Sequence, residues 1–320
     1  MRRMYNAGPV GAATLSRLRA KQAEGFVRVA VGSPPYKRLF IFSFLLLFLC
    51  ACAPEPARQP TESAHVYSKV INTAKFAPIG DLDAPAADLP RKVRAVIVPH
   101  GGEALPMAAA IFAALADRPP ETIILIGPNH TSLGPKIATT YAAFSNYDGL
   151  VLPQENIIQA LEGRGLAGIE DALFEEEHSV GIIMPLLARH LPGVKAVPLI
   201  FQKGVSFNAA KQAIDTACAI AGPDSLIVAS IDFSHGLSSR EEQIRRAKIL
   251  ESIRAYDAAV HLDLDSTYLD APVVLAALLQ RCKENACAME LIEQANTSEL
   301  LGREVPAATG YMTIAFYAVI

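Results

Sequence analysis

The 320-residue chain has no tryptophan, few aromatic residues (7%) and no excess of basic residues outside its N-terminal segment. Residues 1–52 hold eight of the 29 Lys and Arg residues and only one acid, which leaves the remainder with a formal net charge of −10. A body of that charge lacks the basic surface that holds a phosphate backbone, which argues against nucleic-acid binding. Hydrophobic residues make up 51% of the chain, enough to bury a substantial core.

Motifs that are typical of several other protein classes are also missing. The five cysteines include the closely spaced Cys50 and Cys52, and the other three show no CxxC spacing. No disulfide framework or thiolate zinc knuckle is therefore indicated. Ser234 adjoins His235, but the chain has no G-x-S-x-G elbow, which argues against a serine hydrolase. The acidic run at 175–177 is typical of a solvated helix start and gives little support to glycoside hydrolysis.

The longest apolar run, residues 39–49, is too short to span ~30 Å of hydrocarbon as a helix. It follows a basic pair and precedes Leu49-Cys-Ala-Cys52, an order that is typical of a signal peptide. These last four residues resemble a bacterial lipobox. We therefore expect lipidation of Cys52 and an exported, membrane-anchored lipoprotein of the bacterial cell envelope. The alternative is an uncleaved N-terminal anchor helix.

Composition divides the chain into three parts. Residues 1–52 form the expected leader, of which 1–30 show no periodic pattern and are interpreted as the product of a start site assigned too far upstream. Residues 53–90 are rich in proline, which favours an extended tether with short elements around 66–74. Residues 91–320 show no further break in composition and are predicted to form one globular domain.

Within residues 91–320, short β-branched runs alternate with longer helical patterns. The predicted strands are 93–98, 122–126, 196–200, 226–231 and 312–320. The predicted helices are 104–116, 181–190, 209–221, 240–261 and one that starts near residue 272. This alternation favours an α/β fold, in which helices flank both faces of a mainly parallel or mixed sheet.

Histidines follow three of the predicted strands. They are His100, His130 and His235, and a fourth, His178, directly precedes an apolar helical stretch. Because the carboxyl ends of parallel strands meet at one edge of a sheet, we expect these side chains to share a crevice, which would suit a metal ion. A single histidine after a strand is usually a hydrogen-bonded turn residue, but four in comparable positions favour a common site. Asp232 is either a turn acceptor or a group that orients an imidazole or accepts its proton.

The same residues belong to a series of motifs in a fixed order. These are Val98-Pro-His-Gly-Gly, Ile126-Gly-Pro-Asn-His, Glu177-His-Ser-Val, Val197-Pro-Leu-Ile, Ala229-Ser-Ile-Asp-Phe-Ser-His and Thr309-Gly-Tyr-Met-Thr-Ile-Ala-Phe. The ordered set runs through essentially all of residues 91–320 and resembles the Memo family, also called AmmeMemoRadiSam system protein B. The resemblance implies a fold similar to that of class III extradiol dioxygenases, whose non-haem iron lies at an equivalent crevice. It also implies AMMECR1-like and radical SAM proteins as candidate partners.

The resemblance further implies roles for individual residues. His100 and His130 match the two metal-ligand histidines of the family, and His178 matches the histidine of its Glu-His-Ser motif. Asp232 and His235 match an aspartate and a histidine of the pocket.

Two positions depart from the family pattern. The third family ligand is a cysteine ahead of an apolar helix, and the matching stretch here has none. Asp270 could replace it, which would complete the two-His-one-carboxylate triad typical of non-haem Fe(II). The alternative is that Asp270 caps the helix that follows. Glu103 replaces a family tyrosine, which implies a different substrate side of the pocket.

Two classes of function stay open. The first is a metal-dependent oxidoreductase or dioxygenase-like enzyme acting on a small molecule, in which His178 or His235 moves a proton. Its cofactor would be a divalent transition metal, with iron first and copper or zinc as alternatives. The second is a non-catalytic metal-binding or redox-partner lipoprotein that uses the pocket to recognise a ligand or partner.

Overall fold

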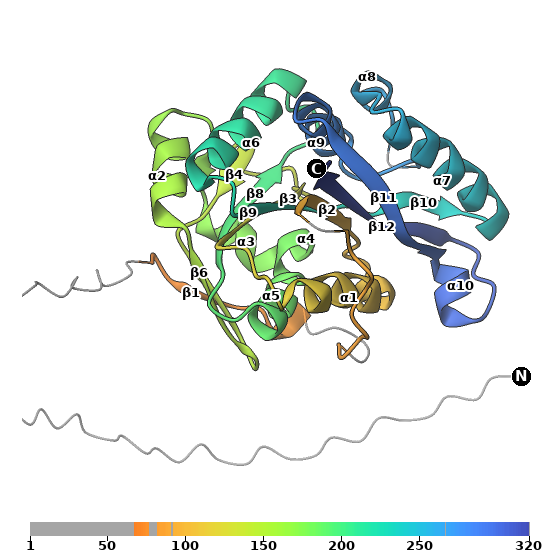
Figure 1. Cartoon of the computed structure of the whole chain (residues 1–320), viewed down its shortest axis with the longest axis horizontal. Helices are drawn as coiled ribbons and strands as arrows, with labels where there is room; N and C mark the ends of the chain where they lie inside the picture. Colours follow the sequence, from red (N-terminus) through yellow and green to blue (C-terminus); the bar gives the residue numbers. More distant parts are fainter. Residues whose placement is uncertain (1–66, 77–81, 91, 266, 320) are drawn as a thin grey trace, which may run out of the picture. The chain divides into compact units, whose positions relative to one another are not determined.

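The computed structural model describes residues 67–76, 82–90, 92–265 and 267–319, all of which belong to one compact unit. These residues form a 12-stranded mixed sheet flanked by helices (Figure 1). The strands are β1 Val70–Asn72, β2 Val93–Val98, β3 Thr122–Pro128, β4 Ile137–Thr139, β5 Ala143–Asn146, β6 Gly149–Pro153, β7 Gly168–Ile169, β8 Lys195–Phe201, β9 Ser225–Ser230, β10 Phe233–Leu237, β11 Cys287–Asn296 and β12 Ala308–Ala318. The main path through the sheet runs β1-β5-β6-β8-β3-β9-β2-β12-β10. The predicted α/β fold class is confirmed.

The centre of the sheet consists of four parallel strands, β8, β3, β9 and β2. Their sequences are continuous apolar runs because both faces of the sheet are covered. Alternate side chains of β2 enter different cores: Ala95 and Ile97 pack on one face, and Val96 and Val98 on the other. All four strands were predicted to within two residues at each end.

The C-terminal strand makes the sheet mixed. β12 runs antiparallel to β2, and it also pairs antiparallel with β11 and β10. Its bounds begin four residues before the predicted 312–320. β11 was missed because its exposed edge position lets it carry Glu and Gln among its apolar residues, which hides the pattern of a strand.

Helices pack on both faces and create the two cores. They are α1 Leu105–Leu115, α2 Glu155–Gly163, α3 Asp171–Glu176, α4 His178–Gly181, α5 Met184–His190, α6 Phe207–Ala221, α7 Ser239–Arg254, α8 Ala258–His261, α9 Pro272–Glu284 and α10 Thr297–Leu301. Ile158 of α2, Ile214 of α6 and Leu275 of α9 lie in one core. Phe112 of α1 and Leu187 of α5 lie in the other.

Two of the predicted helices are interrupted. The segment 240–261 forms α7 and α8, and between them Tyr256 has a left-handed φ of 52°. Asp257 then starts α8, because its side chain accepts a hydrogen bond from the Val260 backbone N–H. The segment 181–190 contains the end of α4 and then α5, whose first turn holds Pro185. The prediction of continuous helices was wrong because it followed apolar spacing and overlooked these local capping residues.

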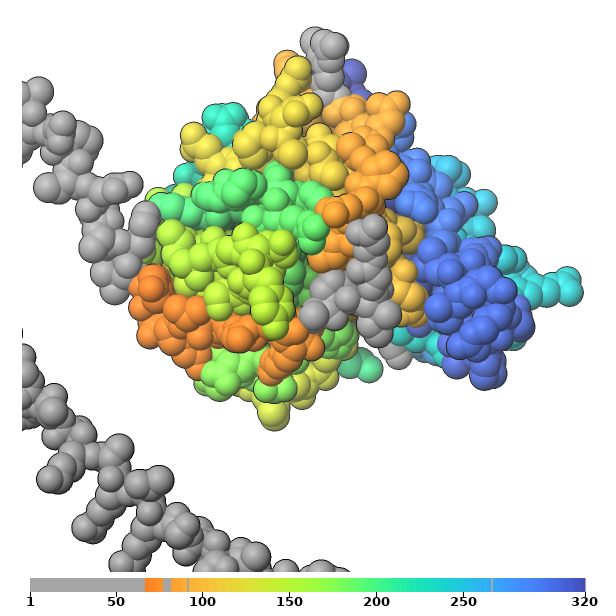
Figure 2. Space-filling view, turned by 90° about the horizontal axis from the view of Figure 1, so that it is seen from below, coloured from red at the N-terminus to blue at the C-terminus, as the bar shows by residue number. Residues whose placement is uncertain are grey.

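The chain before residue 91 packs on the domain where the structure describes it. β1 pairs in parallel with β5, and Ile71 and Leu82 are buried. Figure 2 shows these segments, in orange, on one face of the domain. The packed region therefore begins upstream of the boundary expected at residue 91, and β1 falls within the short elements expected at 66–74.

The leader at 1–52, its Cys52 and the first part of the Pro-rich stretch, 53–66, lie outside the described residues. Among the helices that the structure does describe, none combines the length and the apolar character needed to cross a bilayer.

Candidate metal centre

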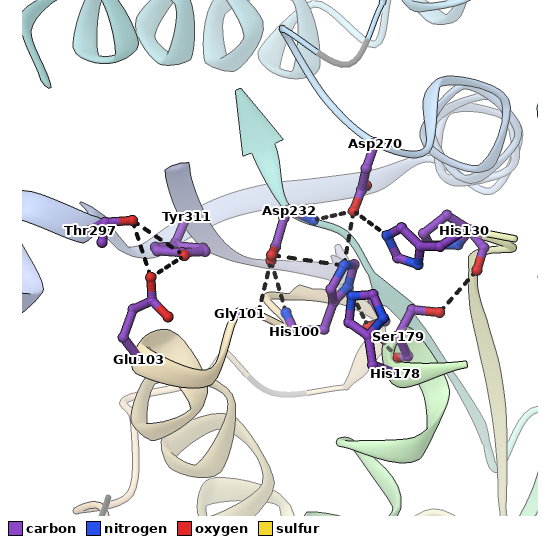
Figure 3. A network of polar contacts seen from close by, with 12 residues as sticks. His100, Gly101, Glu103, His130, His178, Ser179, Asp232, Asp270, Thr297 and Tyr311 are labelled. Atoms are coloured by element: carbon purple, nitrogen blue, oxygen red, sulfur yellow. Dashed lines mark hydrogen bonds and ion pairs between the residues drawn. The ribbon is translucent and has the colours of Figure 1, made fainter. Parts of the chain in front are cut away.

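Three histidines from distant parts of the sequence meet at the carboxyl edge of the central strands (Figure 3). His100 follows β2, His130 follows β3, and His178 begins α4. Their ring centroids are 5.3 Å (His100 to His130), 5.2 Å (His100 to His178) and 4.1 Å (His130 to His178) apart. One ligand nitrogen from each lies within 4.8 Å of the others, so the group could hold a metal ion. The predicted convergence is thus present for the strand-end His100 and His130 and for His178, which precedes a helix.

Asp270 points toward two of these rings. Its Oδ2 lies 2.9 Å from His100 Nε2 and 3.8 Å from His130 Nε2. It does not cap α9, because the N-cap of that helix is Ala271 and no side chain caps it. Its other oxygen, Oδ1, is buried without a hydrogen-bond partner among the described residues. A buried carboxyl oxygen in that position needs a cation or a hydrogen-bond donor, as a metal ligand does.

Asp232 holds the loop that carries His100. Its Oδ1 accepts hydrogen bonds from the backbone N–H groups of His100, at 2.8 Å, and Gly101, at 3.3 Å. Burial raises the pKa of Asp232, an effect that His100 opposes and Asp270 reinforces. His235 lies in β10, close enough to Asp232 to affect its pKa, but it is not in the three-histidine group.

Hydrogen bonds at the outer ring nitrogens orient the inner ones toward Asp270. Ser230 Oγ donates to the Ser179 carbonyl at 2.6 Å, so it acts as the acceptor for His100 Nδ1 at 3.0 Å. His130 Nδ1 lies 2.7 Å from Glu177 Oε1, and the backbone N–H of His130 donates to Glu177 Oε2 at 2.8 Å. In both rings the Nε2 atom then faces Asp270, and a carboxylate behind a histidine is the arrangement common beside metal-bound imidazoles.

Glu177 was missed as a functional residue, because the acidic run at 175–177 was interpreted as a solvated helix start. It is buried, and it also caps α4 by accepting a hydrogen bond from the Ser179 N–H at 2.9 Å. Burial raises its pKa, but hydrogen bonds from His130 and the backbone outweigh this and lower the pKa to about 2. Its neighbours in the run are exposed and pair with Lys69 and Lys75. The available signal was its place directly before His178.

The histidines differ in their charge states. Burial lowers the pKa of His100, but the carboxylates of Asp232 and Asp270 outweigh burial and raise it to about 9. Burial and the neighbouring His130 and His100 lower the pKa of His178 to about 4. Without a metal, His100 therefore carries a proton at neutral pH that a metal must displace, whereas His178 is already a neutral base.

A second polar network adjoins the first (Figure 3). The Tyr311 hydroxyl donates to Glu103 Oε1 at 2.8 Å, and Thr297 Oγ1 donates to the same oxygen at 3.2 Å. Tyr311 lies against the loop after β2, since a Cβ on Gly101 would approach its hydroxyl to 2.6 Å. Glu103, the residue at which the sequence was expected to depart from the family pattern, is thus hydrogen-bonded to Tyr311 of β12.

The fold and this site together define an α/β protein with a histidine cluster, flanked by carboxylates, at the carboxyl edge of its sheet. Residues 79–300 match the family described as Memo-like protein, and the chain belongs to that family.

Two curated relatives agree with this assignment. A MEMO1 family protein of Pyrobaculum arsenaticum is 25% identical over 281 residues, covering 81% of this chain and 99% of its own length. The MEMO1 family protein MK0963 of Methanopyrus kandleri is 27% identical over 256 residues, covering 74% of this chain and 88% of its own. Among solved structures, the uncharacterized protein JW3007 from Escherichia coli K12 matches with a TM-score of 0.44 and 11% identity, covering 70% of this chain and 99% of that one.

Proposed function

We propose that this Memo-like protein is a metal-dependent oxidoreductase, similar in its chemistry to dioxygenases, that uses a non-haem divalent metal. The observation that carries the proposal is the position of Asp270. Its carboxylate faces the Nε2 atoms of His100 and His130, and one of its buried oxygens has no partner among the described residues. Two imidazoles and one carboxylate form the triad that suits Fe(II) and leaves coordination positions open.

The donor set therefore fits iron better than a metal that prefers thiolates. His100, His130 and Asp270 would hold the ion, and His178 lies close enough to be a further ligand. A set of three histidines alone would suit zinc or copper instead. When bound, the metal would act as a Lewis acid that polarises a small-molecule substrate or O₂.

The protein's own groups would handle the protons. His178 is neutral at pH 7, and its side chain is 46% exposed, so it is accessible to a substrate. Its imidazole can accept a proton from a substrate hydroxyl at the free ring nitrogen. Asp232 would keep the His100 backbone in place during turnover through its two hydrogen bonds. His235, close to Asp232, is the second candidate for proton transfer.

The test is nitric oxide binding to the full chain loaded anaerobically with Fe(II), observed by electron paramagnetic resonance. An iron with open positions binds nitric oxide and shows the high-spin signal of that adduct. We expect this signal in the wild type and its loss in His130→Ala. If iron binds but no adduct forms, the site is closed, and the non-catalytic metal-binding role replaces the oxidoreductase.

We also propose that the protein is exported and anchored by a lipid on Cys52. The support is the order of basic pair, apolar run and lipobox-like Leu49-Cys-Ala-Cys52. Mass spectrometry of the native protein should find a lipid-modified Cys52 at the mature N-terminus. Recovery of the chain with an intact N-terminus in the cytosol would reject the proposed export. A membrane-bound, uncleaved chain would support the anchor helix instead.

A further inference from the structure

Three cysteines line a cavity at the opposite end of the sheet from the histidines. The cavity is about 470 Å³ in volume. Cys218 of α6, Cys282 of α9 and Cys287 of β11 contribute to its lining, together with Arg94 and Arg281. All three thiols are free. Ala95 and Ser225 at the starts of β2 and β9 also line it, which places the cavity at the amino edge of the parallel strands.

The end of α9 explains why two of these thiols touch. Asn285 is the C-cap, and Ala286 has a left-handed φ of 50°. The Ala286 N–H donates to the Lys283 carbonyl at 3.1 Å, one of the two hydrogen bonds of a Schellman ending. In that ending the second residue after the cap packs on the third-last residue of the helix. Here those two residues are Cys287 and Cys282, which both line the cavity, and the Cys287 thiol also lies 4.0 Å from the Asn285 carbonyl.

The surroundings give the two thiols different protonation states. The hydrogen bond from Cys282, aided by Arg94 and Arg281 and opposed by burial, lowers the pKa of Cys287 to about 7. The pKa of Cys282 is raised well above its usual value by the same hydrogen bond and by burial. Burial raises the pKa of Cys218 to about 11. Cys287 is therefore the thiol of the pair that ionises more readily near neutral pH, while Cys282 and Cys218 stay protonated there.

We propose that Cys287 and Cys282 form a redox-active dithiol that exchanges with small disulfides bearing a carboxylate. The Arg94 guanidinium on the cavity wall favours an anionic reactant, whereas Arg281 is already paired with the Asp215 carboxylate. The volume falls in the range of small-molecule sites. The proposal concerns groups that take no part in the metal centre, so it stands or falls independently of the proposed function.

The exchange follows the usual two steps. The Cys287 thiolate attacks one sulfur of the disulfide R–S–S–R, forms the mixed disulfide Cys287–S–S–R and releases R–S⁻, which takes a proton from water. The Cys282 sulfur then attacks Cys287 Sγ and displaces the second R–S⁻, to which the Cys282 proton passes. The protein is oxidised by two electrons to the Cys282–Cys287 disulfide, and the small disulfide is reduced to two thiols.

The experiment uses the full chain with Cys50 and Cys52 changed to Ser, so that only Cys218, Cys282 and Cys287 can react with the probe. The probe is dithiobis(nitrobenzoate), a disulfide with a carboxylate on each ring that releases a coloured thiol. We expect a fast phase that releases about two equivalents per chain, because the second step expels the second thiol. Peptide mapping without reductant should then find a Cys282–Cys287 disulfide.

Matched variants separate the roles of the three cysteines. Cys218→Ser should keep the fast phase at about two equivalents, and Cys287→Ser should lose it. Cys282→Ser and Cys282→Ala should both release about one equivalent and stop at the mixed disulfide. A fast phase of one equivalent in the parent chain, or its loss in Cys218→Ser, would overturn the dithiol.

The preference for an anion has its own control. Arg94→Gln should slow the reaction with dithiobis(nitrobenzoate) by roughly threefold to tenfold, and slow the reaction with uncharged dithiodipyridine less. Equal slowing with both reagents would overturn the assignment of a carboxylate-bearing reactant.

Discussion

The two ends of β2 lead to two clusters of ionisable side chains that are built in different ways. At the carboxyl end, His100, His130 and His178 come from three separate parts of the chain: His100 and His130 follow parallel strands that end at one edge, and the first turn of α4 brings His178 to them. At the amino end, Cys282 and Cys287 meet because one helix ends in a tight reversal. The first cluster depends on the topology of the whole sheet, and the second depends mainly on local chain geometry.

The clusters also differ in charge. Asp232, Asp270 and Glu177 surround the imidazoles, an arrangement that favours a cation. Arg94 and Arg281 line the cavity of the thiols. Arg281 is paired with Asp215, whereas Arg94 has no carboxylate partner in the described part of the chain and favours an anion there. The same fold thus offers opposite electrostatic environments at the two edges of its sheet. No residue is shared between the two clusters, so a substitution can change one without replacing a residue of the other.

The largest effect is expected from His130→Ala. It removes an inner ligand nitrogen, so the affinity for Fe(II) or Zn(II) should fall by more than about 100-fold, since loss of an outer partner alone costs 10–100-fold. Isothermal titration measures the affinity. The reaction of the thiols with dithiobis(nitrobenzoate) should stay unchanged. A parallel loss of thiol reactivity would show that the histidine cluster and the thiol pair are coupled and do not act independently.

The identity of the third ligand can be decided by a pair of variants. Asp270→Asn should lower iron affinity by roughly 10–100-fold, because it replaces the carboxyl group that faces both Nε2 atoms by a poorer metal ligand. His178→Ala should reduce metal affinity less. The His178 side chain is half exposed, and its ring nitrogen lies 3.7 Å from the Glu177 carboxylate, whereas that of His130 lies 2.7 Å from it. The reverse ranking, measured by the same titration, would replace the carboxylate triad by a three-histidine site that suits zinc or copper.

The outer shell of the cluster is tested by Glu177→Gln. The amide keeps the size of the side chain and can still accept a hydrogen bond, but it removes the negative charge behind His130. We expect roughly a tenfold loss of metal affinity and a fold that is retained by circular dichroism. Unchanged affinity would mean that Glu177 serves only as the cap of α4.

The sequence showed the metal centre more clearly than the thiol pair. Strand-end placement was sufficient for His100 and His130, because the central strands are uniformly apolar and easily predicted. His178 was found from its place before an apolar helix, and His235, which also follows a predicted strand, is not in the group. The contact of Asp270 with those rings could not be predicted, since it depends on how the chain before α9 crosses the edge of the sheet. Cys282 and Cys287 were overlooked because the search was for CxxC spacing, while their contact depends on the left-handed Ala286.

The smallest effect concerns the buried His261, whose pKa is affected by one carboxylate, whereas three affect that of His100. Burial lowers the pKa of His261 to about 4, and Asp257 offsets this only in part. In the unfolded chain the histidine has a pKa of about 6.5, so it binds a proton below that pH. In the folded protein His261 stays neutral there. The free energy of unfolding is therefore highest above pH ~6.5. It decreases as the pH is lowered, by about 1 kcal/mol between pH ~6.5 and pH ~5.5.

Urea unfolding of the metal-free chain at both pH values measures this loss. His261→Leu should lose about 1 kcal/mol less than the wild type between the two, because the variant has no imidazole to protonate. Since His178 titrates alike in both proteins, it cancels in the difference. An equal loss in both proteins would show that His261 is protonated in the folded state, as His100 is.

The central claim is that the carboxyl edge of the sheet holds one transition-metal ion between His100, His130 and a third protein ligand. Elemental analysis of the full chain, purified without added metal, tests it most directly when paired with the same analysis of His100→Ala. The account predicts about one ion per chain in the wild type, with iron as the main element, and almost none in the variant. A wild-type protein without metal, or equal metal in both proteins, would contradict it.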